Sequence, residues 1–284
     1  MPELPEVETL RRDLRERVLG RTFVEVWVSP DAPRLVREQS PEEFRKALMG
    51  RRIDDIGRRG KYLDFILSDG QHLVVHRRMS GNFLHRRDGA GPDPYLRAVF
   101  RLDDGSELRY CDLRKFGSMW LVADPALVLA GLGPEPLDPG FTPAELERRV
   151  GHRAAPIKSV LLDQRAIAGL GNLYSDEALF AARIHPQRPA RSLSRKEFRR
   201  LHGGIVAALE QGLRNRGSSL GSSLRDHVNL DGVPGSNQDR VQVFQRTGEP
   251  CYTCGTPIRR MRLGGRSTHY CPRCQPSGAM EARG

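Results

Sequence analysis

The sequence predicts an α+β protein with three parts: an N-terminal antiparallel β-sandwich flanked by helices, a helical region, and a C-terminal β-hairpin that holds a metal ion. Three observations support this fold class. Short strand-like runs, some joined by Asp-Gly turns, fill residues 20–125. Helical periodicity dominates residues 144–214. Four cysteines form two pairs between residues 251 and 274.

The N-terminal part is predicted to begin with a helix from Pro5 to about Leu19, because apolar residues recur there at helical spacing. Pro5 suits the first helical position, and Gly20 suits the stop. A capping box at Ser40 predicts a second, shorter helix. Strands are predicted at residues 23–28, 62–67, 72–77, 97–102, 107–111 and 118–122.

A Pro- and Gly-rich segment after residue 125 is predicted to link the sandwich to the helical region. Within that region, residues 217–238 are rich in Gly, Ser, Asp and Asn, and they predict a long loop. The predicted parts are the first domain 1–125, the linker 126–143, the helical domain 144–240, the finger 241–276 and a frayed tail 277–284.

The charge of the chain favours a polyanionic partner. Its 284 residues carry a net charge of +11, with a pI near 9.9. No apolar run approaches the roughly 20 residues that span a membrane, and the acidic N-terminus lacks the pattern of a secretory signal. We therefore expect a soluble, intracellular protein, and a monomer, since nothing in the sequence asks for an oligomer.

The strongest single motif is Cys251-x2-Cys254, followed after sixteen residues by Cys271-x2-Cys274. Two pairs at this spacing can close a tetrahedral four-thiolate zinc site, which leaves no open position for catalysis. Arginines and a Gly-Gly turn between the pairs predict a β-hairpin with a basic tip, able to enter a nucleic-acid groove. The alternative is a zinc ribbon that binds protein or only stabilises its domain.

Pro2 and Glu3 form a second candidate site. Removal of Met1 would expose Pro2 as a secondary amine. An α-amino group titrates at about pH 7.7 to 8.0, so a useful fraction of the molecules would carry an uncharged nucleophile at neutral pH. With a sugar aldehyde carbon, such an amine forms an iminium, an electron sink for elimination steps. Taken alone, such a motif is more often a plain helix entry than a nucleophile.

A glycine-rich turn, Gly169 to Asn172, precedes a predicted helix at residues 172–182. Glycines at a helix start allow close backbone approach, and the free N–H groups make a seat for an anion such as a DNA phosphate. The motif is weakly specific, because it is as often an ordinary tight turn.

Two short loops, residues 76–81 and 112–117, each leave a predicted strand. Their Met79, Arg114 and Phe116 are candidate wedges, because an enzyme that takes a base out of the DNA stack must fill the void and hold the orphaned partner. The alternative for Met79 and Phe116 is ordinary core packing.

The order of these motifs resembles that of the bacterial formamidopyrimidine-DNA glycosylases, over residues 2 to about 275. No single motif is decisive, but their joint order makes coincidence improbable. The resemblance rests on residues 2–8, Arg59-Gly60-Lys61-Tyr62-Leu63, Met79-Ser80-Gly81, Arg114-Lys115-Phe116-Gly117, the turn 169–172 and the four cysteines.

The resemblance implies a base excision repair glycosylase with AP lyase activity, a helix-two-turns-helix motif around Asn172, and one structural Zn²⁺. Pro2 would attack the deoxyribose C1′ of a damaged nucleotide in double-stranded DNA and expel an oxidised purine. Glu3 would manage protons, and the iminium would drive β- and δ-elimination. Such an enzyme would be cytoplasmic and associated with the bacterial nucleoid.

The resemblance also carries roles onto single positions. Lys61 matches a lysine that contacts the phosphate and the damaged site, and Glu6 matches an acidic neighbour of the lesion. Lys158, Asn172 and Arg266 match phosphate-gripping positions. The implied catalytic set is Pro2, Glu3, Lys61 and Arg266; the implied DNA-binding set is Glu6, His76, Met79, Arg114, Phe116, Lys158, Asn172 and Arg225.

Three departures from the family pattern affect these expectations. Arg77-Arg78 replaces a usual Leu-Gly, Leu113 replaces a Pro, and residues 235–238 stand where an aromatic pair is usual. The preference between 8-oxoguanine and ring-opened purines therefore stays open. Two alternatives also stay open: endonuclease VIII-type activity on oxidised pyrimidines, and a non-catalytic zinc-finger protein that binds damaged DNA.

Overall fold

The computed structural model describes residues 2–87, 89–220 and 227–277. Its contacts divide the chain into two compact units, which are described separately. The first unit comprises residues 1–130 and 212–238, and the second comprises residues 131–211 and 239–284. The contacts thus group the glycine- and serine-rich segment with the N-terminal unit, whereas the sequence placed it with the helical domain.

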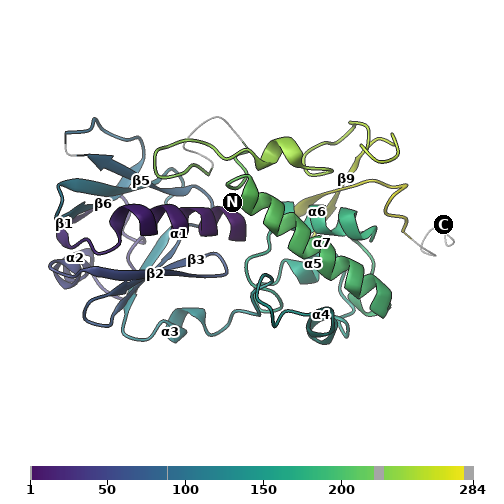
Figure 1. Ribbon diagram of the computed structural model, residues 1–284, viewed down its shortest axis with the longest axis horizontal. Coiled ribbons are helices and arrows are strands. Elements are labelled where there is room, and N and C mark those ends of the chain that lie inside the picture. Colours follow the sequence, from purple (N-terminus) through teal and green to yellow (C-terminus); the bar gives the residue numbers. More distant parts are fainter. Residues whose placement is uncertain (1, 88, 221–226, 278–284) are drawn as a thin grey trace. The chain divides into compact units, whose positions relative to one another are not determined.

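Two four-stranded antiparallel sheets form the first unit (Figure 1). Their strand orders are β1-β6-β7-β5 and β2-β3-β4-β8. The strands are β1 Phe23–Val28, β2 Ile53–Arg59, β3 Tyr62–Leu67, β4 His72–His76, β5 Gly81–Arg87, β6 Leu96–Leu102, β7 Ser106–Asp112 and β8 Ser118–Val122. The sequence did not predict β2 and β5, because charged residues interrupt β2 and the apolar run of β5 is short, with polar or charged residues at its ends.

Helix α1, Leu4–Val18, supplies one side of the core of this unit. Its apolar face packs with aromatic and aliphatic side chains from both sheets. This core includes Val7, Leu10, Leu14, Val18, Phe65, Phe83, Phe100 and Tyr110. The helix starts at Leu4, one residue before the prediction, because Glu3 and Glu6 form a capping box. A second helix, α2 (Pro41–Leu48), begins with the predicted Ser40 capping box.

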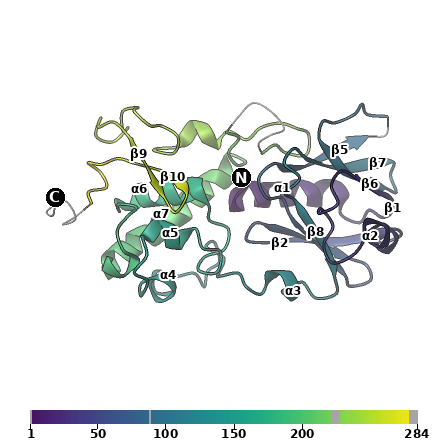
Figure 2. The ribbon, with the colours of Figure 1, turned by 180° about the vertical axis from the view of Figure 1, so that it is seen from behind.

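The second unit is mainly helical and ends in the hairpin (Figure 2). A short helix, α3 (Ala126–Leu129), lies in the predicted linker, just before the second unit begins. The helices are α4 Pro143–Val150, α5 Ile157–Leu161, α6 Asn172–Ala182 and α7 Arg195–Arg214. Helix α7 crosses the boundary between the two units. The strands are β9 Arg259–Leu263 and β10 Arg266–Tyr270. None of the helices in the described part of the chain is long and apolar enough to cross a membrane.

Candidate active site and metal centre

The N-terminal residues are fixed at the start of α1. Pro2 is buried, and so are the side chains of Glu3 and Glu6. The Glu6 carboxylate accepts one hydrogen bond from the Glu3 backbone nitrogen at 2.8 Å and another from the Ser218 nitrogen, also at 2.8 Å. Glu6 therefore holds the residue next to Pro2 with one oxygen and the 212–238 segment with the other.

Lys61 and His76 lie on adjacent antiparallel strands of the first unit. Lys61 immediately precedes β3, and His76, the last residue of β4, pairs in register with Tyr62. Burial, together with the positive charges of Arg78 and Lys61, lowers the pKa of His76 to about 3. The imidazole is therefore neutral at pH 7, and its Nδ1 accepts a hydrogen bond from the Arg78 nitrogen at 2.9 Å.

The two wedge loops are joined through the buried carboxylate of Asp112. Its Oδ1 accepts from the Ser80 hydroxyl at 2.5 Å, and its Oδ2 accepts from the Gly117 nitrogen at 2.8 Å. The Arg114 nitrogen also donates to Oδ1, at 3.2 Å. One carboxylate thus fixes the ends of both loops, which the sequence analysis did not foresee.

These loops place the three candidate wedge residues in different environments. The Arg114 guanidinium lies 3.2 Å from the Met79 sulfur. Phe116 is 55% exposed, so ordinary core packing does not explain it. Met79 is half-buried. The structure therefore brings Met79 and Arg114 together and leaves Phe116 open to solvent.

Two glycines in these loops are required by Tyr110. A Cβ atom at Gly81 or at Gly117 would overlap the Tyr110 hydroxyl oxygen. The tyrosine is completely buried, and its hydroxyl has no hydrogen-bond partner among the described residues. Its ring packs against Phe83, with the two centroids 5.1 Å apart. Both loop backbones therefore run directly against the Tyr110 hydroxyl, and only glycine fits at these two positions.

In the second unit, the predicted glycine turn leads into α6. Gln164 holds this turn, because its carbonyl accepts from the Gly169 nitrogen at 3.0 Å and its amide donates to the Leu170 carbonyl at 2.7 Å. Gly169 has a φ of +87°, a conformation that favours glycine. Asn172, the first residue of α6, donates from Nδ2 to the Ser267 carbonyl at 3.0 Å. Its side chain thus connects the turn to the hairpin.

Lys158 is placed differently from the phosphate-gripping position that the resemblance implies. Its side chain and that of Asp176 are both fully buried, and the Nζ to Oδ1 distance is 2.6 Å. The ammonium also donates to the Thr268 hydroxyl at 2.8 Å and to the Ser267 carbonyl at 3.1 Å. Lys158 therefore contacts α6 and β10 within the interior, where no ammonium surface is open to a phosphate.

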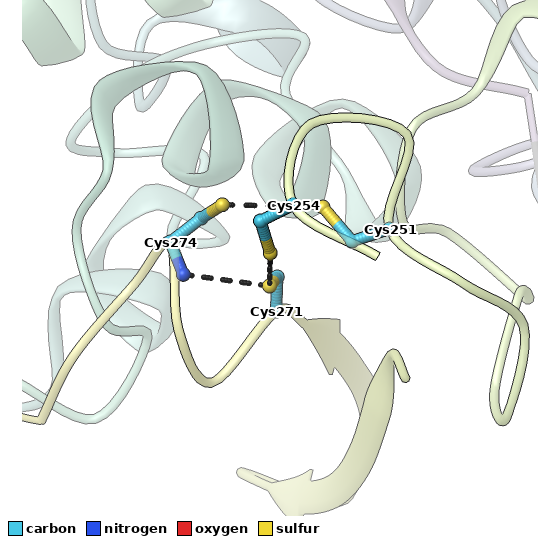
Figure 3. Close-up of side chains that lie close together, drawn as sticks. All are labelled: Cys251, Cys254, Cys271 and Cys274. Carbon is cyan, nitrogen blue, oxygen red and sulfur yellow. Dashed lines mark hydrogen bonds between the residues drawn. The ribbon is translucent and has the colours of Figure 1, made fainter. Parts of the chain in front are cut away.

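The four cysteines are close together, as Figure 3 shows. All four sulfurs lie within 4.8 Å of one another, with Cys254 3.5 Å from Cys271 and Cys251 3.9 Å from Cys274. A tetrahedral zinc with Zn–S bonds of about 2.3 Å requires sulfurs about 3.8 Å apart. The four-thiolate set therefore fits one structural Zn²⁺.

Two adjacent acidic residues of α6 hold the finger in place, and neither was predicted from the sequence. Asp176 accepts from the His269 nitrogen on β10 at 2.9 Å. Glu177 accepts from the backbone nitrogens of residues 242, 243 and 244 at 2.7, 3.0 and 2.9 Å. The available signal was a pair of adjacent carboxylates in a helix whose other residues are uncharged.

The hairpin carries the predicted basic surface. Arg266 begins β10 and is exposed, and Arg259 and Arg260 on β9 are also exposed. Gly264 and Gly265 form its turn with φ values of +55° and +75°. Arg225, the remaining predicted DNA-binding residue, lies outside the described residues.

These features define a class of protein: a two-unit, nucleic-acid-directed protein with a buried Pro-Glu start and a four-cysteine basic hairpin. Three family models cover most of the chain. Residues 1–119 match the formamidopyrimidine-DNA glycosylase N-terminal domain, residues 132–223 match its H2TH domain, and residues 248–276 match the zinc finger found in FPG and IleRS.

Similar sequences agree with these matches. The formamidopyrimidine-DNA glycosylase of Symbiobacterium thermophilum is 49% identical over 97% of this chain and 90% of its own length. That of Geobacillus kaustophilus is 45% identical over 97% of this chain and all of its own length. The chain belongs to the formamidopyrimidine-DNA glycosylase family, DNA-repair enzymes with glycosylase and lyase activity.

Solved structures show the same fold. The MutM (Fpg) protein of Thermus thermophilus superposes with a TM-score of 0.86 at 42% identity, over 96% of this chain and 98% of its own. Lactococcus lactis Fpg in complex with abasic-site DNA gives 0.88 at 34% identity, over 96% and 99%. The predicted α+β class, helix-two-turns-helix domain and zinc finger are therefore confirmed.

Proposed function

We propose that this protein excises oxidised purines from double-stranded DNA and cleaves the resulting abasic site, with the Pro2 nitrogen as nucleophile. The observation that carries the proposal is the Glu6 carboxylate, which holds the Glu3 backbone beside Pro2 at the buried start of α1. A capping box explains the bond between Glu3 and Glu6, but it explains neither the burial of Pro2 nor the second bond of Glu6, to the Ser218 nitrogen.

The proposed reaction begins after Met1 has been removed. The Pro2 nitrogen forms a bond to C1′ of the damaged nucleotide, the glycosidic bond breaks, and the base leaves with a proton. Glu3 supplies or accepts the protons needed for base departure and ring opening. The product is an iminium between Pro2 and the opened sugar.

The iminium then withdraws electrons from the sugar. Loss of a C2′ proton expels the 3′ phosphate, and a second elimination expels the 5′ phosphate. Water hydrolyses the remaining iminium, which returns the free Pro2 amine and releases the unsaturated sugar fragment. The DNA is left with a gap that carries phosphates at both ends.

The other predicted residues receive roles by position. Lys61, beside the neutral His76, supplies a cation for a phosphate near the lesion. Arg266 and the start of α6 at Asn172 are proposed to bind phosphates, since the hairpin is basic and a helix N-terminus favours anions. The buried Lys158 acts indirectly, because it holds β10 and therefore Ser267, the partner of Asn172.

The wedge set and the finger serve DNA recognition in this proposal. Met79, Arg114 and Phe116 would fill the gap left by a flipped nucleotide. Cys251, Cys254, Cys271 and Cys274 would hold one Zn²⁺, which in a closed four-thiolate site supplies folding energy to the hairpin. The cysteine set offers no open position for a substrate.

Solved structures of relatives support oxidised purines as substrates. A point mutant of Lactococcus lactis FPG, which is 34% identical to this chain, was solved in complex with DNA containing Fapy-dG. The family match favours this over the endonuclease VIII alternative and over a non-catalytic DNA-binding protein. With bacterial relatives, we place the activity in the cytoplasm on nucleoid DNA.

Borohydride trapping tests the proposal. Processed protein is incubated with duplex DNA carrying 8-oxoguanine opposite cytosine, a formamidopyrimidine, or an abasic site, and reduced in place. A covalent adduct whose peptide map places the DNA on Pro2 supports the mechanism. Absence of an adduct on all three substrates contradicts it. Faster cleavage of an oxidised pyrimidine than of 8-oxoguanine would instead favour the endonuclease VIII activity.

A further inference from the structure

Arg77 occupies an interior position that the proposed reaction does not use. It follows β4 directly and is 1% exposed, although the resemblance expects leucine there. Burial lowers the pKa of its guanidinium to about 10, so the group is still a cation at pH 7. A buried cation is costly unless its donors are satisfied. The hydrogen bonds of the guanidinium therefore show how the buried charge is stabilised.

The hydrogen-bond partners of Arg77 among the described residues are neutral acceptors, although the charges of Glu6 and Asp112 also act on the guanidinium. Its Nε donates to the Gly81 carbonyl at 2.6 Å, and one terminal nitrogen donates to the Asn82 side-chain oxygen. Both terminal nitrogens lie 3.4 Å from Nδ1 of His227. Arg77 thus joins the β4–β5 connection to a residue 150 positions further along the chain.

His227 is the neutral acceptor of this contact. Its ring is buried, and burial together with the charge of Arg77 lowers its pKa well below the usual range. The Nε2 atom lies 3.2 Å from the Arg216 carbonyl, to which it can donate its hydrogen. Nδ1 is then left without a hydrogen and can accept from the guanidinium. The imidazole thereby connects Arg77 to the backbone at residue 216.

The segment that His227 enters is itself held together by short contacts. The Val228 nitrogen donates to the Asn82 oxygen at 3.3 Å, and the Ser219 hydroxyl donates to the His227 carbonyl. The Gly235 nitrogen donates to the Ser219 hydroxyl at 3.1 Å. Residues 216–219 and 227–235 are therefore one connected piece, and Arg77 and Asn82 attach it to the sheet.

This piece lies directly on Glu6. The Ser218 nitrogen donates to the Glu6 carboxylate. At Gly217, where φ is +84°, an added Cβ would lie 3.0 Å from both Glu6 Oε1 and the His227 ring. The backbone at Gly217 therefore lies close against both the Glu6 and the His227 side chains. A shift of His227 would be passed to the carboxylate that holds the Glu3 backbone.

We propose that Arg77 is a positioning residue for the catalytic N-terminus. Through His227 and Asn82, its guanidinium fixes residues 216–219 against Glu6, and Glu6 in turn fixes the backbone beside Pro2. The inference rests on the proposed role of Pro2. It predicts an effect on the rate of the chemical steps, because Arg77 is buried and presents no group to DNA.

The test compares four variants by single-turnover kinetics on 8-oxoguanine duplex, with active protein counted by borohydride trapping. Arg77→Met and His227→Phe remove the contact, and both are expected to lower the excision rate constant about tenfold to a hundredfold. His227→Asn keeps an acceptor near the Nδ1 position and should retain most of the wild-type rate. Arg109→Met is the control, a buried arginine of β7 bonded to Glu107 and Asp93.

DNA affinity separates positioning from damage to the fold. The Kd for duplex with an uncleavable abasic-site analogue should stay within about twofold for all four variants, because none removes a DNA-facing group. Melting temperatures are recorded, and rates are measured well below them. If Arg77→Met turns over like wild type per trapped molecule, or if His227→Asn is as slow as His227→Phe, the inference is wrong.

Different results would contradict the proposed function and the inference about Arg77. If wild-type protein forms no adduct with abasic DNA, the nucleophile assignment fails before any variant is compared. If wild type is active and the control Arg109→Met is as slow as Arg77→Met, the loss reflects general destabilisation of the sheet. That result would overturn the inference and leave the proposed function intact.

Discussion

Lys158 and Asp176 form an ion pair with a 2.6 Å Nζ to Oδ1 distance, and neither side chain has any exposed surface. The pair joins α5 to α6, and Thr268 and Ser267 of β10 accept from the same ammonium. Removing one member of a buried pair leaves an uncompensated charge. The contribution of Lys158 to DNA binding should therefore be indirect.

Salt dependence of DNA binding distinguishes the direct and indirect roles. Arg266→Ala should lower the slope of log Kobs against log salt by about one, because each phosphate contact releases about one counterion. Lys158→Met should leave the slope unchanged. It should also destabilise the second unit by about 3–5 kcal/mol, measured by urea unfolding. An equal loss of slope in both variants would mean that Lys158 reaches DNA.

Retention of Met1 should abolish the chemistry without weakening binding. An amide nitrogen is not a nucleophile, so protein purified with Met1 uncleaved should give no borohydride adduct. Its affinity for abasic-site duplex should match that of processed protein from the same preparation. N-terminal sequencing establishes the fraction processed, and turnover by fully unprocessed protein would reject Pro2.

Gly117→Ala should disturb the wedge loop. The added Cβ would overlap the fully buried Tyr110 hydroxyl, and overpacking of this kind costs about 1–3 kcal/mol. We expect lower stability together with weaker binding to duplex containing an abasic site. Gly91→Ala is the control, because nothing lies within 4 Å of its added Cβ. Equal melting temperatures for the two variants would contradict the packing argument.

Loss of zinc should affect the finger and spare the sandwich. Cys271→Ser, or chelation, removes a ligand from the four-sulfur cluster, so β9 and β10 should lose their order. DNA affinity should fall, whereas the near-ultraviolet signal from the aromatic core of the first unit should persist. If the affinity for DNA were unchanged after complete zinc removal, the finger would not contribute to DNA binding.

Glu8 should make stability depend on pH. Burial raises its pKa, but hydrogen bonds and charges from Arg11, Arg12 and Arg58 outweigh this and lower the pKa to about 2. A lowered pKa stabilises the folded state above the unfolded value near 4.5, and this stabilisation is lost as pH falls towards 2. Urea unfolding should show wild type more stable than Glu8→Gln at pH 6, with the difference shrinking between pH 5 and 2.

Local patterns were enough to predict much of the fold. Helix α1 follows from helical spacing of leucine and valine, α2 from the Ser40 capping box, and the metal centre from cysteine spacing. These features depend on interactions within a few residues, which the sequence states directly. Strand β2 escaped prediction, because Asp55 and Arg58 interrupt its apolar alternation and bond to side chains elsewhere in the unit.

The sequence by itself determined which chemistry is available: a processed Pro2 beside Glu3, four thiolates, and exposed arginines on a hairpin. Only the tertiary structure decided which polar groups pair with one another. It buried Lys158 against Asp176, and it bound the 212–238 segment to Glu6 through Ser218. Such pairings join residues far apart in the chain, and a buried donor takes whichever acceptor the packed elements bring within reach. No local pattern specifies that acceptor.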